Sequence, residues 1–217
     1  MFHSLLALLF PPRCVLCKEF LDKEETDLCH HCRETAPTAE KSQFKLSFVA
    51  GWTAVWYYKD TVRNSILRYK FSGRRSYAPA YARALGMKLR KQGMDHFDVL
   101  TFVPIAPLRR FRRGYDQMEL LATALGDELG ATSVRTLKKI RNTPPQSGIR
   151  DASRRRANVL GAYKCTDASL VRGKRVLLLD DVITTGATVS ECARILLTAG
   201  AKEVCCGAIA VTNHTTK

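Results

Sequence analysis

A run of thirteen residues in the last quarter of the chain constrains the fold most strongly. It begins with four consecutive apolar residues, Val176–Leu179. Because they show no polar alternation, they favour a strand that is covered on both faces of a parallel sheet. The carboxylates Asp180 and Asp181 come next, followed by the segment 184–188 with a glycine at its centre. Ligands bind beyond the carboxyl ends of parallel strands, so we expect these polar residues to line a site at one edge of the sheet.

The polar part of this run suits a sugar that carries a phosphate. The carboxylates of Asp180 and Asp181 can accept hydrogen bonds from two vicinal hydroxyls of a ribose. Gly186 lets the backbone approach closely, and the helix expected at 189–197, capped by Gly200, would point its positive end at the loop. Successive N–H groups and threonine hydroxyls there favour a dianionic 5'-phosphate.

Two other interpretations compete with this one. Paired acids after an apolar strand also hold magnesium in P-loop proteins, but no G-x-x-x-x-G-K-[ST] motif precedes them in this chain. An acidic and threonine-rich turn can also be a simple helix cap. The full length of the run favours the sugar phosphate.

Two C-x-x-C pairs stand near the N-terminus, separated by an eleven-residue loop, and their cysteines are Cys14, Cys17, Cys29 and Cys32. Four thiolates complete a tetrahedral zinc site with no open position, so the pattern predicts a structural metal. The loop is rich in charged residues and offers little apolar surface for folding without metal. Disulfides are the alternative, which a reducing compartment disfavours. His30 or His31 could also replace one cysteine ligand.

The net charge of +15 indicates anionic partners, either nucleic acid or a polyphosphorylated small substrate. Residues 101–160 hold twelve Lys and Arg against five acids. A basic face therefore lies before the phosphate loop in the chain.

The N-terminal residues Phe2–Phe10 are apolar but have no preceding Lys or Arg and no small-residue cleavage site. They fall short of the roughly 20 residues that span a bilayer. We therefore expect no signal peptide and no integral membrane segment, and a soluble cytoplasmic protein. Loose membrane association of this segment is a second interpretation.

The hydrophobic pattern and the positions of turn-forming residues predict two domains, a small module at 1–40 and a main α/β domain at 45–217. A polar linker within 33–46 would join them. In the main domain, strands are expected at 48–58 and 97–103 and helices at 60–71, 77–92 and from Asp116 to about Gly126. Trp52, Trp56, Tyr57 and Tyr58 fit strand packing better than stacking on a base. Asp116 and Glu119 have the spacing of a capping box.

The order of five motifs in the chain resembles one known family. The motifs are V-P-I-A-P-L, R-R-G-Y-D-Q, R-N-T-P-P-Q-S-G-I-R, R-R-R-A-N-V-L-G-A-Y and L-L-L-D-D-V-I-T-T-G-A-T. They are similar to those of the ComF family of competence-associated phosphoribosyltransferase-like proteins, and the cysteine pairs fit as well. Asp116 departs from the pattern, because the family more often has asparagine there.

The resemblance implies a type I phosphoribosyltransferase fold, a parallel sheet flanked by helices, with a small N-terminal zinc-binding module. It implies that phosphoribosyl pyrophosphate binds with magnesium. Asp180 and Asp181 would hold the ribose hydroxyls, and Arg141 and Arg150 would act with them in catalysis. The pyrophosphate would be approached by the segment 105–110, which consists of Ile105, Ala106, Pro107, Leu108, Arg109 and Arg110. The 5'-phosphate would be held by Thr184, Thr185, Gly186, Ala187 and Thr188. Weaker candidates for phosphate contact are Lys70 and Arg113.

Residues 141–158 resemble the mobile loop that closes over the active site of related enzymes. The arginines Arg154, Arg155 and Arg156 within it fit a lid, a solvated face or a nucleic-acid patch about equally. The resemblance further implies transfer of the ribosyl group to a nitrogen nucleophile that the sequence does not identify, and partners among single-stranded DNA and competence-machinery proteins. A non-catalytic sensor that binds phosphoribosyl pyrophosphate and nucleic acid is the alternative function.

Overall fold

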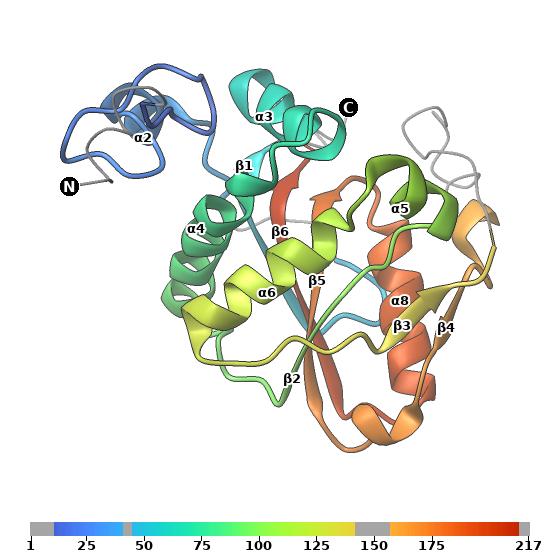
Figure 1. Ribbon diagram of the computed structural model, residues 1–217. Coiled ribbons are helices and arrows are strands. Elements are labelled where there is room, and N and C mark those ends of the chain that lie inside the picture. The colour runs from blue at the N-terminus through green and yellow to red at the C-terminus, as the bar shows by residue number, and fades with distance from the viewer. Residues whose placement is uncertain (1–10, 41–44, 142–156, 213–217) are drawn as a thin grey trace, which may run out of the picture.

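The computed structural model describes residues 11–40, 45–141 and 157–212 (Figure 1). Its main sheet contains four parallel strands in the order β1-β6-β5-β2. The strands are β1 (Gly51–Tyr57), β2 (Val99–Phe102), β5 (Arg175–Ile183) and β6 (Glu203–Val211). β5 therefore lies inside the sheet, with β6 on one side and β2 on the other.

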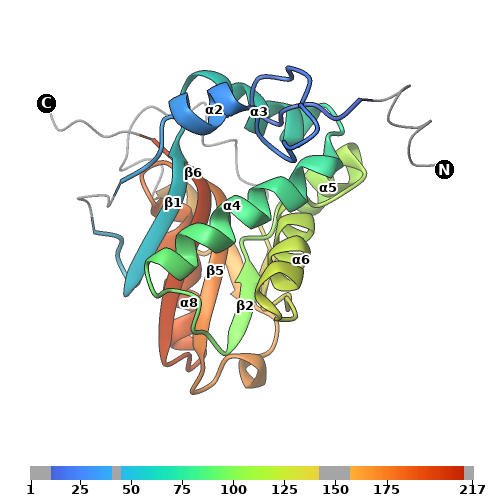
Figure 2. The same cartoon turned by 90° about the vertical axis from the view of Figure 1, so that its left-hand side faces the viewer.

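Helices cover both faces of this sheet (Figure 2). One face carries α3 (Asp60–Phe71), α4 (Ala78–Lys91) and α6 (Gln117–Leu129), and the other carries α8 (Ala187–Thr198). Leu177 and Leu179 of β5 pack with the first group, whereas Val176 and Leu178 pack with α8. The unbroken apolar run of β5 is thus needed because both of its faces are buried, and the predicted α/β class with a helix-flanked parallel sheet is confirmed.

Short elements complete the main domain. A second sheet pairs β3 (Leu137–Lys139) with β4 (Tyr163–Cys165) in antiparallel fashion. The short helix α5 (Pro107–Arg113) follows β2, and single 3-10 turns lie at η1 (Arg75–Tyr77) and η3 (Ala168–Leu170). Within the described ranges, no helix has the length and apolar character that a bilayer crossing requires.

The predicted helix starting at Asp116 is longer than expected. The Asp116 carboxylate accepts hydrogen bonds from the N–H groups of Met118 and Glu119, which confirms it as the N-cap of α6. The helix continues past Gly126, which lies inside it. The Ala131 carbonyl comes so close to Gly126 that a side chain would not fit there. It ends at Gly130, which adopts a left-handed conformation with φ of 69°.

The N-terminal segment packs directly on the main domain. Its helix α2 (His30–Thr35) and the loop before it bury Cys14, Val15 and Leu16 in the same hydrophobic cluster as α3 and α4. Residues 37–39, expected in a linker, instead lie along the free edge of β1, where the Tyr57 N–H donates to Pro37 O and the Ala39 N–H to Val55 O. The boundary between two domains at 40–45 stays a prediction.

Candidate functional site

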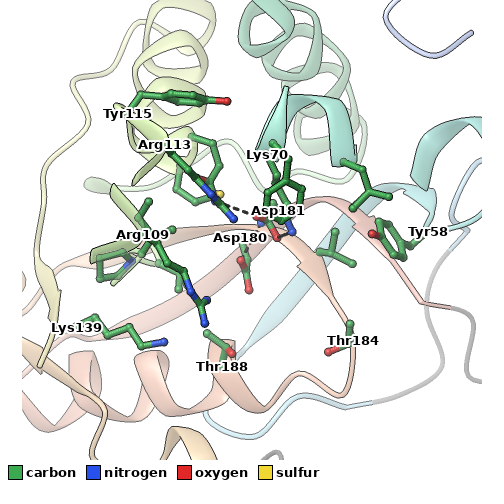
Figure 3. Close-up of a pocket in the computed structure, with 18 of the residues that line it drawn as sticks. Tyr58, Lys70, Arg109, Arg113, Tyr115, Lys139, Asp180, Asp181, Thr184 and Thr188 are labelled. Carbon is green, nitrogen blue, oxygen red and sulfur yellow. Dashed lines mark hydrogen bonds and ion pairs between the residues drawn. The ribbon is translucent and has the colours of Figure 1, made fainter. Parts of the chain in front are cut away.

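A pocket of about 660 Å³ opens at the carboxyl ends of β5 and β2 (Figure 3). Its wall combines residues from α3, the loop after β2, α5, the start of α6, β3, β4 and the loop after β5. Asp180, Asp181, Thr184 and Thr188 all line it. The ligand site that the sequence predicts at this sheet edge therefore coincides with a pocket lined by charged and hydroxyl side chains.

Asp181 is held by a lysine from a distant part of the chain. The Lys70 Nζ atom donates to Asp181 Oδ1 at 2.9 Å, and both side chains are largely buried. The amide of Gln117 lies 3.4 Å from the other carboxylate oxygen. Figure 3 shows the Asp181 side chain turned toward Lys70 and the Asp180 side chain turned away from it. Lys70 and Gln117 thus hold the Asp181 carboxylate in place, whereas the Asp180 carboxylate points to another part of the pocket.

The surroundings of Asp180 change its protonation. Burial, and then the charge of Asp181, raise the pKa of Asp180 to about 7, while Lys70 and Lys139 oppose the rise. The Asp181 N–H donates to Asp180 Oδ1 at 2.8 Å. At neutral pH the Asp180 carboxyl can therefore exchange a proton when a ligand brings new donors or cations to it.

The loop after β5 has the features expected for binding a phosphate. Gly186 adopts φ of 74°, and α8 starts at the next residue, Ala187. Thr184 and Thr188 line the pocket, and Gly186 and Ala187 are buried between them. In the described part of the chain, the Thr185 hydroxyl is buried without a hydrogen-bond partner. The N–H groups that open a 12-residue helix, together with hydroxyl donors, make a suitable anion site.

Only some residues of the segment 105–110, which is predicted to approach a pyrophosphate, line the pocket. Ile105 and Arg109 line the pocket. Ala106 is the buried N-cap of α5, Pro107 occupies the first turn, and the Leu108 side chain is exposed. Arg110 instead pairs with Glu119 at 3.3 Å. The helical turn brings only part of the segment 105–110 to the pocket.

Arg113 does reach the pocket, where it joins α3 to α6. Its guanidinium lies over the ring of Phe71 at 4.6 Å and donates to Gln117 Oε1 at 2.7 Å. Arg141, by contrast, is exposed, does not line the pocket and donates to Leu160 O at 2.9 Å. Arg150, the arginines Arg154–Arg156 and most of the predicted lid fall outside the described residues.

Lys139 is a pocket residue that the sequence did not single out. It lies on β3, contacts the ring of Tyr163 and lines the pocket with it. Burial, followed by the nearby charge of Arg109, lowers the pKa of Lys139. Leu137 is buried two positions earlier, so the alternation along a strand was the available signal that Lys139 faces inward.

The aromatic residues of β1 divide in a similar way. Trp56 is buried in the core, as the packing interpretation predicts. Trp52 and Tyr57 pack partly buried against the cluster on the α8 side. Tyr58, the residue after the strand, lines the pocket. Tyr58 also packs against the hydrophobic cluster of α3 and α4, so it contributes both to the core and to the wall of the pocket.

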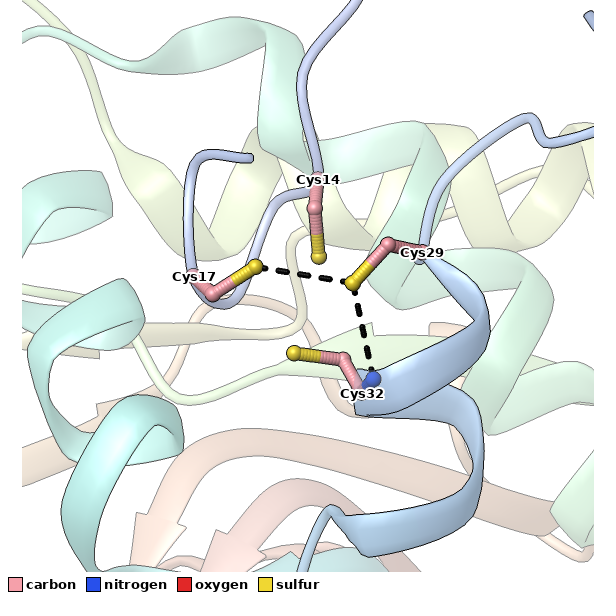
Figure 4. Close-up of side chains that lie close together, drawn as sticks. All are labelled: Cys14, Cys17, Cys29 and Cys32. Carbon is pink, nitrogen blue, oxygen red and sulfur yellow. Dashed lines mark hydrogen bonds between the residues drawn. The ribbon is translucent and has the colours of Figure 1, made fainter. Parts of the chain in front are cut away.

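The four N-terminal cysteines come together as one cluster, called here the cysteine knuckle: Cys14, Cys17, Cys29 and Cys32 (Figure 4). Their sulfur atoms all lie within 4.8 Å of one another. The Sγ atoms of Cys17 and Cys29 are 3.6 Å apart, too far for a disulfide bond. His30 is turned to Glu34 at 3.3 Å and is not in the set. Four convergent sulfurs fit the tetrahedral coordination of a structural zinc ion.

Comparisons with known proteins agree with both parts of the chain. The sequence model of the phosphoribosyl transferase domain matches residues 104–217, and that of the double zinc ribbon domain matches residues 5–43. The chain belongs to the phosphoribosyl transferase domain family. Within that family it is a ComF-type phosphoribosyltransferase-like protein that carries a zinc ribbon at its N-terminus.

Three relatives support this placement. DNA utilization protein YhgH of Salmonella typhimurium is 35% identical over 140 residues, which span 62% of this chain and 60% of the relative. Competence protein F of Haemophilus influenzae is 26% identical over 215 residues, or 88% of this chain and 93% of that protein. Competence protein ComFC of Streptococcus pneumoniae is 28% identical over 209 residues, or 94% and 90% respectively.

Proposed function

We propose that the pocket binds phosphoribosyl pyrophosphate together with magnesium, and that the protein acts in the handling of DNA during competence. One observation carries the first part: a carboxylate pair and a glycine-containing helix start lie side by side in one pocket. Carboxylates match ribose hydroxyls and the helix start matches a phosphate. The names of the related competence and DNA utilization proteins support the second part.

Each group of pocket residues has a role in this proposal. Asp180 and Asp181 accept hydrogen bonds from the ribose hydroxyls, and residues 184–188 surround the 5'-phosphate. Arg109, Arg113 and Lys139 line the same pocket and offer positive charge to the pyrophosphate. Magnesium, when bound with the ligand, would neutralise part of the charge on the pyrophosphate oxygens. The excess of cations at the pocket is what a ligand with several phosphate charges requires.

As a transferase, the protein would bring a nitrogen nucleophile to C1 of the ribose. The new C–N bond forms as the C1–O bond to pyrophosphate breaks, and the pyrophosphate leaves with the bonding electron pair. Arg109 and Lys139 stabilise the charge that builds on this leaving group. No side-chain nucleophile takes part, so the role of the protein is to position the reactants and stabilise charge.

A second candidate function is a sensor that binds phosphoribosyl pyrophosphate and single-stranded DNA without catalysis. Helix α5 favours it, because Phe111 is 86% exposed there among the arginines of Pro107–Arg113. Exposed aromatic rings beside cations stack with the bases of single strands. The two functions share the ligand site and differ in whether pyrophosphate is released.

Calorimetry of phosphoribosyl pyrophosphate binding with magnesium tests the site. We expect the isosteric double variant Asp180→Asn with Asp181→Asn to weaken binding by at least about a hundredfold, because amide oxygens accept hydrogen bonds more weakly than carboxylates do. Asp127→Asn, at an exposed position of α6, serves as the matched control and should bind as the wild type does. Wild-type affinity in the double variant would refute the site assignment.

Pyrophosphate release distinguishes the two functions. The screen supplies nucleobases, amines and single-stranded DNA as acceptors, with magnesium present and the double variant as the blank. Acceptor-dependent release supports the transferase. Tight binding of the ligand with no release for any acceptor, together with single-stranded DNA binding, supports the sensor.

A further inference from the structure

Helix α3 contacts the cysteine knuckle through its polar side chains. Arg68 Nη2 donates to the carbonyl oxygens of Val15 at 3.0 Å and Leu16 at 2.6 Å. Val15 and Leu16 are the two residues between Cys14 and Cys17, so their carbonyls belong to the loop that presents two sulfurs to the metal. The Ser65 hydroxyl also bonds Val15 O and is itself hydrogen-bonded to Tyr81 at 2.6 Å.

The same helix contacts the ligand pocket with the residues that follow. Lys70 Nζ donates to Asp181 at 2.9 Å. The fully buried Tyr69 hydroxyl donates to Gln117 O at 2.5 Å, and the Tyr115 hydroxyl donates back to Tyr69 O. Gln117 is the residue that approaches the second oxygen of Asp181. Three polar contacts thus tie the end of α3 to the acid pair, Asp180 and Asp181, and its neighbours.

These two sets of contacts lie close together on a rigid element. Arg68 and Lys70 are two residues apart, a rise of about 3 Å along a helix. Leu16 packs in the same buried cluster as Val62 and Ile66 of α3, so no flexible segment separates the knuckle from the helix. Figures 1 and 2 show α3 next to the N-terminal segment in both views. A shift of the Cys14–Cys17 loop must therefore move α3 or break these bonds.

We propose that Arg68 is a positioning residue that couples the metal-bound cysteine knuckle to the ligand pocket. The knuckle holds the Val15 and Leu16 carbonyls in place, Arg68 holds α3 against them, and α3 delivers Lys70 to Asp181. The part of this inference that concerns phosphoribosyl pyrophosphate rests on the proposed function. Because coupling between two sites is reciprocal, the ligand must also tighten the hold on the metal.

Equilibrium competition for zinc with a chelator, with and without phosphoribosyl pyrophosphate and magnesium, tests this coupling in the zinc-loaded chain of residues 1–217. We expect the ligand to raise the affinity for zinc about tenfold in the wild type. Arg68→Ala should still bind zinc but lose this effect and bind the ligand about tenfold more weakly. Arg63→Ala, at an exposed position of the same helix, should behave as the wild type.

A conservative variant separates positioning from a general role in stability. Arg68→Lys keeps a charged donor for the two carbonyls but loses the contact of Arg68 Nε with the Tyr77 hydroxyl at 3.4 Å, so we expect it to restore part of the ligand effect on the affinity for zinc. It also serves as the test if Arg68→Ala does not fold. A ligand effect of wild-type size in Arg68→Ala, or in Arg68→Lys when Arg68→Ala does not fold, would overturn the inference.

Hydrogen exchange tests the positioning step without any ligand. In the zinc-loaded protein, Arg68→Ala should speed exchange in the last turn of α3 and near Asp181, and leave α8 protected as before. If the wild type fails to bind phosphoribosyl pyrophosphate, the proposed function fails while this measurement still decides the role of Arg68. Unchanged exchange around Asp181 would count against the coupling.

Discussion

The cysteine knuckle and the acid pair each bring acidic side chains close together. The positive charge that balances these side chains has a different source at each site. At the acid pair, Lys70 provides a positive charge 2.9 Å from Asp181. At the knuckle, the set of four sulfurs includes no basic side chain, and burial and then the neighbouring thiols raise the pKa of Cys32. Because thiols lose their protons when they bind a metal, the balancing cation of the knuckle is the metal ion, whereas that of the acid pair is Lys70 of the protein itself.

This difference matches what each site must do. A closed set of four sulfurs has no position left for exchange, so its metal stabilises structure. A pocket that carries its own cation stays folded without a ligand and can bind and release one repeatedly. Removing the cation from each site in turn should therefore have very different consequences.

Removal of zinc should have the largest effect. Structural zinc contributes on the order of 10 kcal/mol of binding free energy in isolated zinc fingers, so its loss should unfold residues 14–32 and destabilise α3 beside them. Hydrogen exchange after treatment with a chelator should show rapid exchange there and slow exchange in β5 and β6. Cys165→Ser, at a half-buried cysteine outside the knuckle, should leave the zinc content unchanged. Full protection of residues 14–32 without metal would contradict the comparison.

Removal of Lys70 should have the next largest effect. In Lys70→Met two carboxyls remain close together without their cation, so we expect a loss of about 3 kcal/mol at pH 8. The native state then holds extra protons, so stability falls as pH rises, and the loss should be smaller at pH 5. Urea denaturation at the two pH values measures this. Lys91→Met, on the exposed surface of α4, is the control, and an equal loss at both pH values would show that charge is not the cause.

Removal of a charge from the acid pair itself should have the smallest effect. The pKa of Asp180 is raised to about 7, so in the folded protein the carboxyl is neutral well below pH 7 and ionised above it. The destabilising effect is absent below the ordinary pKa near 4 and complete above 7. Asp180→Asn should therefore stabilise the ligand-free protein by about 1 kcal/mol at pH 8 and have almost no effect at pH 4. A uniform change across this range in thermal melting would refute the assignment.

Features that depend on neighbouring residues were predictable from the sequence. The apolar run of β5, the C-x-x-C pairs and the cap at Asp116 each follow from the chemistry of a few adjacent residues, and the structure confirms them as elements. The family resemblance added the order of the motifs along the chain. Local patterns of this kind determine periodicity, metal-ligand spacing and caps directly.

Contacts between distant residues were not predictable in the same way. Lys70 and Asp181 are 111 residues apart, and only the docking of α3 brings them together. Arg68 binds the backbone carbonyls of Val15 and Leu16. Because every residue has a carbonyl, no residue type in the sequence marks these two as its partners. The division of segment 105–110 between pocket and surface follows from the direction in which α5 begins. These features depend on packing, which single-sequence patterns do not encode.

The short contact between residues 37–39 and β1 has a consequence for the solubility of any shortened chain. β1 is an outer strand, and its Tyr57 N–H and Val55 carbonyl are occupied by this passing segment. Bare outer strands invite pairing with other molecules and lead to aggregation. A fragment that starts at residue 45 would lose this cover along with the zinc ribbon. Residues 37–39 therefore also shield the edge of the sheet from intermolecular pairing, independently of any metal bound by the cysteine knuckle.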